Sequence, residues 1–223
     1  MNKTETYLTL RSTALQCPRC HLAQTRTQVV FGEGALDALV MLVGQGPGRV
    51  EDQTGRPFVG PAGRLLDQAL EAVGLARSDL YVTNVIKCWA FQTVGGRRQD
   101  RPPTAAERKA CAIWLTQEIQ IVKPRIIVCL GAPAAQAFLG SRFKMTTDRG
   151  RWHPTSEGQW LIATYHPAYI LRLKSLDAVA YGRTWQAFLD DFRQVAAKAR
   201  EFPKPGTLEG SAGQSASPLS SSR

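Results

Sequence analysis

The stretch Ala38–Gly48, ALVMLVGQGPG, opens with an apolar run, Ala38–Gly44, that reads as one buried strand and ends in a loop rich in Gly and Pro. Nearly continuous apolar runs of this length are typical of parallel strands covered on both faces. Three further runs have the same character: Leu80–Val85, Arg125–Gly131 and Trp160–Tyr165. The four runs together predict a parallel sheet with buried strands.

Helical patterns lie between the predicted strands. Helices are expected after Pro61, from Thr104, after Gly131 and around Trp185–Val195. The second of them opens with the spacing of a capping box, and the others carry apolar stripes at helical spacing. Strands that alternate with helices predict an α/β protein, here a three-layer α/β/α sandwich around a four-stranded parallel sheet. We expect residues 1–200 to form this one domain.

The composition narrows the class of protein. The chain has 223 residues, a formal net charge of +10 and five cysteines. It shows neither the long apolar run of a membrane span nor the apolar core of a secretory signal, so we expect a cytoplasmic protein with no membrane segment. An odd number of cysteines cannot be paired completely, so we do not expect a disulfide framework. We expect the protein to be a monomer.

The C-terminal segment 201–223 is rich in Pro, Gly and Ser and poor in large apolar residues. Such a segment cannot bury enough apolar surface to offset its ordering entropy, so we expect a disordered tail. Its two basic residues cancel its two acidic residues. The net charge therefore belongs to residues 1–200, where a folded basic surface attracts a polyanion such as nucleic acid.

Polar and glycine-rich residues follow three of the four predicted strands. They are Gln45–Gly48, Asn84–Cys88 and His166–Ala168. Ligands of parallel α/β sheets collect at the carboxyl ends of the strands. We therefore expect these three segments to outline one pocket.

Four cysteines are candidate metal ligands. Cys17 and Cys20 form a close pair in a loop, Cys88 ends a strand, and Cys111 faces inward from a helix. Four such thiols can hold a zinc ion or an iron–sulfur cluster, and their spacing does not distinguish the two. The alternative is that Cys88 and Cys111 are merely buried. Cys129, inside an apolar run, is interpreted as a small buried hydrophobe.

Each candidate pocket residue has a functional and a structural interpretation. Gly46 lies in a rigid turn whose backbone approaches a ligand closely, or in a plain turn. Phe58 is a stacking platform for a flat base or a core contact. Asn84 reads the edge of a base through its amide or caps a turn. His166 donates a hydrogen bond to a developing anion or is structural.

The glycine loop departs from a dinucleotide-binding fingerprint. Arg49 occupies the position of the last glycine. About twelve residues separate it from the next expected helix, so a pyrophosphate would lack the helix N-terminus it needs. A rigid turn is the better interpretation.

Taken in chain order, these motifs resemble the iron–sulfur uracil-DNA glycosylases of family four, from Cys17 to the last helix. The resemblance rests on Cys17-x2-Cys20, Gly44-Gln-Gly-Pro-Gly48 with Glu51-Asp52, Gly55-Arg-Pro-Phe-Val-Gly-Pro-Ala-Gly63, Thr83-Asn-Val-Ile-Lys-Cys88, Cys111 and His166-Pro-Ala168. It implies a four-stranded parallel α/β/α domain, a [4Fe-4S] cluster, and excision of uracil from DNA.

The same resemblance implies a role for each residue. Phe58 stacks on the uracil, Asn84 hydrogen-bonds its edge, and His166 faces its O2. The cluster ligands are Cys17, Cys20, Cys88 and Cys111. Residues Tyr169–Leu171 are expected to wedge into the vacated base stack, and Arg172 to contact a backbone phosphate.

Gln45 is a departure from the family pattern. The family carries Glu at this position, where a carboxylate orients or deprotonates the attacking water. Gln accepts a hydrogen bond from water but cannot take its proton, and Gly46 offers no replacement. General-base catalysis contributes about 10²–10⁴-fold, so we expect diminished activity.

The segment Trp89–Pro103, WAFQTVGGRRQDRPP, is a second departure because it is longer than the family-four linker. It resembles the arginine-rich loop of the UdgX-type subgroup, whose members bind uracil-DNA very tightly and become covalently attached through a loop His. Here Asp100 occupies the matching position. We hypothesise that Asp100 swings into the pocket and supplies the carboxylate that Gln45 lacks. The loop arginines expected to contact DNA are Arg97, Arg98 and Arg101.

The expected function is that of a DNA glycosylase, which hydrolyses the N-glycosidic bond of a flipped uracil or related deaminated base. The alternative is a tight uracil-DNA-binding protein with little or no turnover, which Gln45 and the arginine-rich loop favour. A third class is a metal-stapled nucleic-acid-binding protein without a base pocket. The base range and strand preference stay open.

Overall fold

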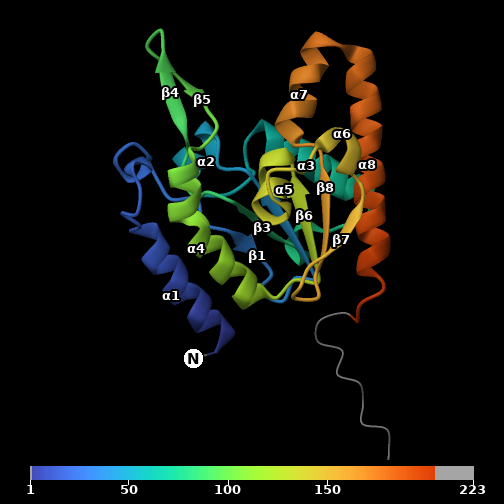
Figure 1. Cartoon of the computed structure of the whole chain (residues 1–223), viewed down its shortest axis with the longest axis horizontal. Coiled ribbons are helices and arrows are strands. Elements are labelled where there is room, and N and C mark those ends of the chain that lie inside the picture. The colour runs from blue at the N-terminus through green and yellow to red at the C-terminus, as the bar shows by residue number, and fades with distance from the viewer. Residues whose placement is uncertain (1, 204–223) are drawn as a thin grey trace, which may run out of the picture.

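Four parallel strands form the middle of the sheet in the computed structural model, which describes residues 2–203 (Figure 1). In order across the sheet they are β3 (Tyr81–Asn84), β2 (Val40–Gly44), β6 (Ile126–Leu130) and β8 (Trp160–Thr164). Each lies within a run predicted to be a strand, and their parallel pairing is confirmed. Gly44 pairs with Asn84, and Leu130 pairs with Thr164. The carboxyl ends therefore meet at one edge of the sheet.

The prediction of a four-stranded, purely parallel sheet is wrong at the edges. The sheet has six strands in the order β1-β3-β2-β6-β8-β7. β1 (Glu33–Gly34) pairs with β3 and β7 (Trp152–Pro154) pairs with β8, both antiparallel. These strands are too short to produce an apolar run in the sequence. Short edge strands are one way to limit pairing with other chains.

Helices cover both faces of the sheet, as the sandwich prediction requires (Figure 1). One face carries α1 (Lys3–Leu15), α4 (Ala105–Val122), α5 (Ala132–Leu139) and α6 (Met145–Asp148). The other carries α3 (Pro61–Ala72), α7 (Pro167–Leu176) and α8 (Ala178–Ala199). Along β2, Met41 and Val43 pack into the first core and Val40 and Leu42 into the second. This alternation explains why the strand is apolar throughout.

Several elements were not predicted. Helix α1 opens at a capping box in which the Asn2 side chain accepts from Glu5 N at 2.9 Å, but it has little apolar periodicity. Helix α2 (Arg49–Thr54) begins directly after Gly48, so the expected helix-free gap after the glycine loop is wrong. Strands β4 (Phe91–Val94) and β5 (Arg97–Asp100) form a separate antiparallel hairpin. Within residues 2–203 there are also two 3₁₀ turns, His21–Gln24 and Arg77–Asp79.

The predicted tail lies, from residue 204 onward, outside the described residues. Within the described part, Phe202 still packs against the second core. No helix in residues 2–203 has the length and apolar character that crossing a membrane demands.

Candidate active site

Three predicted pocket residues meet at the carboxyl ends of the strands. Any side chain at Gly44 would collide with both Asn84 Oδ1 and the Phe58 ring, so these two groups flank the end of β2. The rings of Phe58 and His166 have centroids 5.9 Å apart. The structure thus brings together Phe58, Asn84 and His166 from the loop before α3, the end of β3 and the start of α7. Only glycine fits at position 44, because a side chain there would overlap both groups.

Phe58 is held in an unusual backbone conformation. Its φ is 53°, in the left-handed region that residues other than glycine rarely adopt. Glu51 Oε1 accepts hydrogen bonds from Val59 N at 3.0 Å and Gly60 N at 2.7 Å, which fixes the turn just after it. The carbonyl of Phe58 lies where a side chain of Gly63 would be. These contacts aim the buried ring and show a constraint typical of functional sites.

Asn84 is the one residue of this group with an unsatisfied buried atom. It is 1% exposed, and its Oδ1 has no hydrogen-bond partner among the described residues. Its backbone carbonyl, in contrast, accepts a bond from Lys87 Nζ at 2.7 Å. A buried acceptor without a donor costs about 1–3 kcal/mol, which a ligand that brings an N–H would recover. We therefore expect a ligand of this site to place a hydrogen-bond donor opposite Asn84 Oδ1.

His166 is prepared to donate a hydrogen bond without carrying a charge. Its Nδ1 accepts from Ala168 N at 3.1 Å, so the neutral ring carries its proton on Nε2. Burial, together with a smaller effect of the positive charge of Arg172, lowers the pKa of His166 to about 4. At neutral pH the ring is an uncharged donor.

Gln45 and Gly46 continue from β2 into the glycine loop. The Gln45 carbonyl accepts from Ile86 N at 3.1 Å, which extends the β2–β3 pairing beyond the strands. A side chain at Gly46 would lie 2.7 Å from Ile86 Cγ1, so the close approach predicted for this glycine is made to Ile86. The Gln45 side chain is partly exposed.

Asp100 lies at the base of the β4–β5 hairpin, opposite Phe91. Its Oδ1 accepts a hydrogen bond from Trp89 Nε1 at 2.7 Å. The Trp89 ring in turn packs on Phe91, with centroids 4.6 Å apart. For Asp100 to act in the pocket, as predicted, the bond to Trp89 has to break.

The loop arginines differ in their surroundings. Arg97 is exposed on the hairpin, and the Arg98 guanidinium lies over the Phe91 ring, 4.5 Å from its centroid. Arg101 makes two bonds to the buried carboxylate of Glu107, at 2.9 and 2.7 Å. These bonds lower the pKa of Glu107 to about 2. Arg101 thus fixes the hairpin to α4, and a phosphate would have to compete with Glu107 for it.

Helix α7 limits which of the residues Tyr169–Leu171 can wedge into DNA as predicted. Ile170 is fully buried in the second core and cannot enter DNA. Tyr169, in contrast, is 42% exposed. Arg172 is exposed one turn further along, with its guanidinium 5.9 Å from the Tyr169 ring centroid. Leu171 is partly buried against the same core, so Tyr169 and Arg172 are the predicted contact residues of α7 that lie exposed.

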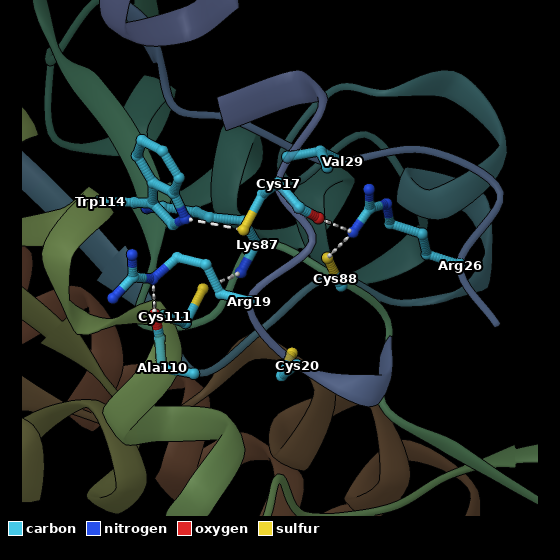
Figure 2. Close-up of a pocket in the computed structure, with 10 residues that line it drawn as sticks. All are labelled: Cys17, Arg19, Cys20, Arg26, Val29, Lys87, Cys88, Ala110, Cys111 and Trp114. Carbon is cyan, nitrogen blue, oxygen red and sulfur yellow. Dashed lines mark hydrogen bonds between the residues drawn. The ribbon is translucent and has the colours of Figure 1, made fainter. Parts of the chain in front are cut away.

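Four of the five cysteines line one small cavity (Figure 2). They are the predicted ligands Cys17, Cys20, Cys88 and Cys111. Cys129 is fully buried in β6, away from this cavity, as predicted. All five are free thiols. Among residues 2–203 no three side chains of His, Cys, Asp or Glu lie close enough to hold a single metal ion.

Hydrogen-bond donors point at three of these sulfur atoms (Figure 2). Cys17 Sγ accepts from Trp114 Nε1 at 3.3 Å, and Cys111 Sγ from Lys87 N at 3.2 Å. Arg26 Nη1 lies 3.7 Å from Cys88 Sγ. Burial raises the pKa of Cys88 to about 12 and that of Cys111 to about 11, so both keep their protons unless a metal replaces them.

Sequence reasoning missed a buried network behind the pocket. Lys87 is 1% exposed and pairs with the fully buried Glu118 of α4. Lys87 Nζ also donates to Thr83 Oγ1 at 2.6 Å. Glu51, which fixes the turn after Phe58, does carry a signal, because its position three residues after Gly48 has the spacing of a helix-capping acid. No comparable signal in the sequence identifies Glu118.

The fold is that of an α/β protein in which an aromatic ring, a buried amide and a neutral imidazole meet at the carboxyl ends of the strands, and four thiols line a separate cavity. The chain belongs to the uracil DNA glycosylase superfamily, whose family model matches residues 31–193. It is 43% identical to the Type-4 uracil-DNA glycosylase of Thermotoga maritima over 161 residues, which are 72% of this chain and 80% of that protein. It is 38% identical to the Type-4 uracil-DNA glycosylase of Pyrobaculum aerophilum over 188 residues, 78% of this chain and 92% of that protein. The Type-4 uracil-DNA glycosylase of Archaeoglobus fulgidus is also 38% identical over 165 residues, 70% of this chain and 79% of that protein.

The His166 imidazole is expected to titrate near pH 4, well below the ordinary value of 6.5. Burial disfavours the charged ring, and Arg172 is the charged group that faces it. The unfolded chain takes up this proton near pH 6.5 and the folded chain only near pH 4. Stability contributed by neutral His166 is therefore present above pH 6.5 and falls as the pH drops towards 4. NMR titration of the ring measures this, with His166→Asn assigning the signal; a midpoint at or above 6.5 would contradict it.

Proposed function

We propose that this protein excises uracil from DNA by flipping the nucleotide into the pocket and hydrolysing its N-glycosidic bond. Membership of the uracil DNA glycosylase superfamily and the Type-4 relatives support this reaction. The observation that carries the proposal is the buried, unpartnered Oδ1 of Asn84 beside the Phe58 ring. A flat base with an N–H on its edge satisfies both groups.

Asn84 selects uracil through the direction of its hydrogen bonds. Its Oδ1 accepts from the uracil N3–H, and its Nδ2 donates to the uracil O4. Cytosine presents an acceptor at N3 and a donor at C4, so both bonds would be reversed. The acceptor would stay buried and unpaired, at a cost of about 1–3 kcal/mol.

Phe58 and His166 act on the base once it is bound. The Phe58 ring stacks on the uracil, and its constrained backbone holds it in place before the ligand arrives. As the bond between N1 and C1′ breaks, its electron pair leaves with the uracil and negative charge grows on O2. The Nε2–H of neutral His166 donates to this oxygen. Removing a comparable donor from an oxyanion site costs about 2.7–4 kcal/mol.

Water completes the reaction at C1′, and here Gln45 replaces the carboxylate of the family pattern. The Gln45 amide orients the water through a hydrogen bond but takes no proton from it. Gly46 lets the loop backbone lie against Ile86. We propose that Asp100 supplies the missing carboxylate after leaving Trp89, which requires the 2.7 Å bond between them to open.

Uracil excision is tested with single-turnover assays on uracil-containing oligonucleotides, read as alkali-labile product. Wild type is expected to act on uracil and not on cytosine, whose edge reverses both hydrogen bonds of Asn84. Asn84→Ala is expected to lower the single-turnover rate about 5- to 150-fold, because it removes the buried Oδ1 proposed to bind the edge of the base. Gln186→Ala removes an exposed amide on α8 and serves as the matched control. A stable shift of uracil-DNA without product would instead support the tight-binding alternative.

Exchanging the two carboxylate positions tests the catalytic water. Gln45→Glu restores a proton acceptor and is expected to raise the single-turnover rate, by up to about 10²–10⁴-fold. Asp100→Asn is expected to slow the wild type but not the Gln45→Glu variant, because only the former depends on Asp100. Equal rates for Asp100→Asn and wild type would exclude a catalytic role for Asp100.

We further propose that Cys17, Cys20, Cys88 and Cys111 hold a [4Fe-4S] cluster. The resemblance of the cysteine motifs to the iron–sulfur family supports a cluster rather than a zinc ion. The thiols surround one cavity, and donors from Trp114, Lys87 and Arg26 approach three of the sulfurs. Such donors stabilise thiolates bound to a cluster. The cluster would tie the N-terminal loop to β3 and α4, a structural role.

Metal analysis of protein purified without oxygen tests the cluster. We expect about four iron atoms and four sulfides per chain, with broad absorption in the visible blue. Cys88→Ser is expected to lose iron and to lower the melting temperature. Cys129→Ala is the matched control, because Cys129 lies in β6 outside the cavity. Colourless protein with one zinc per chain would overturn the assignment.

The proposed DNA surface consists of the exposed arginines Arg97, Arg98 and Arg172. DNA contact by Arg101 stays a prediction, since its guanidinium is already bound to Glu107.

The arginine-rich hairpin supports a narrower proposal, that the chain is allied to the UdgX-type subgroup. The protein is proposed to act as a monomer in a reducing compartment such as the cytoplasm, which preserves its thiols.

A further inference from the structure

We propose that the β4–β5 hairpin is a DNA-reading ribbon that enters the major groove beside the flipped nucleotide and discriminates the flanking base pairs. The proposal rests on the proposed function for the position of the DNA. It assigns a recognition surface to residues outside the pocket, above all Gln92 and Gln99.

The hairpin has a tight turn at its tip and is anchored to the domain at its base. Gly95 and Gly96 have φ values of 56° and 75°, which is the tight two-residue turn that matches the twist of two paired strands. At its base, Trp89 and Ala90 are buried, and Arg101 N donates to Ala90 O at 3.0 Å. Figure 1 shows the hairpin and α7 projecting from the same end of the molecule. A duplex whose nucleotide enters the pocket meets both.

One face of the hairpin is occupied by contacts within the protein. Phe91 lies opposite Asp100, and Thr93 lies opposite Arg98. Trp89 binds Asp100, and Arg98 covers Phe91. Because the side chains of this face contact one another, base reading is assigned to the second face.

The second face has the side chains that read bases. Gln92 lies opposite Gln99, and Val94 lies opposite Arg97. All four are exposed, and none has a side-chain hydrogen bond or ion pair within residues 2–203. Gln makes paired hydrogen bonds to adenine, Arg to guanine, and an apolar side chain contacts the methyl group of thymine.

Size and charge favour the major groove of DNA as the occupant. The two strands of the ribbon lie about 4.8 Å apart, so with their side chains they fit a major groove about 12 Å wide but not a minor groove about 6 Å wide. The hairpin carries Arg97 and Arg98, and its one carboxylate, Asp100, is bound to Trp89. The ribbon is therefore complementary to a polyanion.

Duplex binding separates groove reading from mere phosphate contact. Fluorescence anisotropy measures the affinity of wild type, Gln92→Ala/Gln99→Ala and Thr93→Ala for uracil duplexes that differ only in the flanking base pairs. Wild type is expected to show at least about a fivefold spread of affinity across flanks. The double variant is expected to lose this spread, whereas Thr93→Ala, on the opposite face, keeps it.

Two outcomes overturn the ribbon proposal. One is an equal affinity of wild type for all flanking base pairs, and the other is a spread of affinity that the double variant retains. After either outcome, contact with phosphate is the only role left for the hairpin. Single-strand uracil excision by wild type is measured in parallel and reports on the pocket. Suppose that wild type does not excise uracil but binds duplexes with a flank-dependent affinity, and that the double variant loses this dependence. That result would refute the proposed function and support the ribbon.

Discussion

The rest of the site depends on the buried ion pair between Lys87 and Glu118. Two charges in an apolar interior are costly unless their remaining hydrogen bonds are satisfied, and removing one partner of such a pair costs about 3–5 kcal/mol. Glu118 meets this demand by accepting from Gly32 N at 2.9 Å and Tyr81 Oη at 3.1 Å, and Lys87 by donating to the Asn84 carbonyl. The pair therefore joins α4, β3 and the N-terminal loop, and it sets the direction of the chain as it leaves β3.

That direction has three consequences along one continuous segment. Asn84 is fixed through its backbone carbonyl, so its side chain is free to hydrogen-bond a base. Lys87 N approaches Cys111, which places Cys88 on the thiol-lined cavity. The chain then enters the hairpin, whose far end is returned to α4 by Arg101 and Glu107. Base recognition, the proposed cluster and the proposed ribbon thus share one support.

The sequence predicts those parts of the fold that leave a local pattern. The central strands are buried on both faces and so are continuously apolar, and Thr104 announces α4 through its capping box. The edge strands and α2 are too short to leave such a pattern. Asn84, Phe58 and His166 follow recognisable strand ends and loops, whereas the role of Glu118 arises only when α4 packs on β3. A helical glutamate looks the same in sequence whether it faces solvent or a buried lysine.

The distribution of charge agrees with the proposed chemistry. The groups proposed to contact the base are neutral: an amide, an aromatic ring and an imidazole whose pKa burial lowers to about 4. A cationic His166 would bind an anion tightly but would be costly to bury before the anion exists. A neutral donor costs little in the empty site and gains strength as charge develops in a medium that screens weakly. The positive charges, such as Arg97 and Arg172, lie at the surface, where they attract phosphate without opposing the entry of a neutral base.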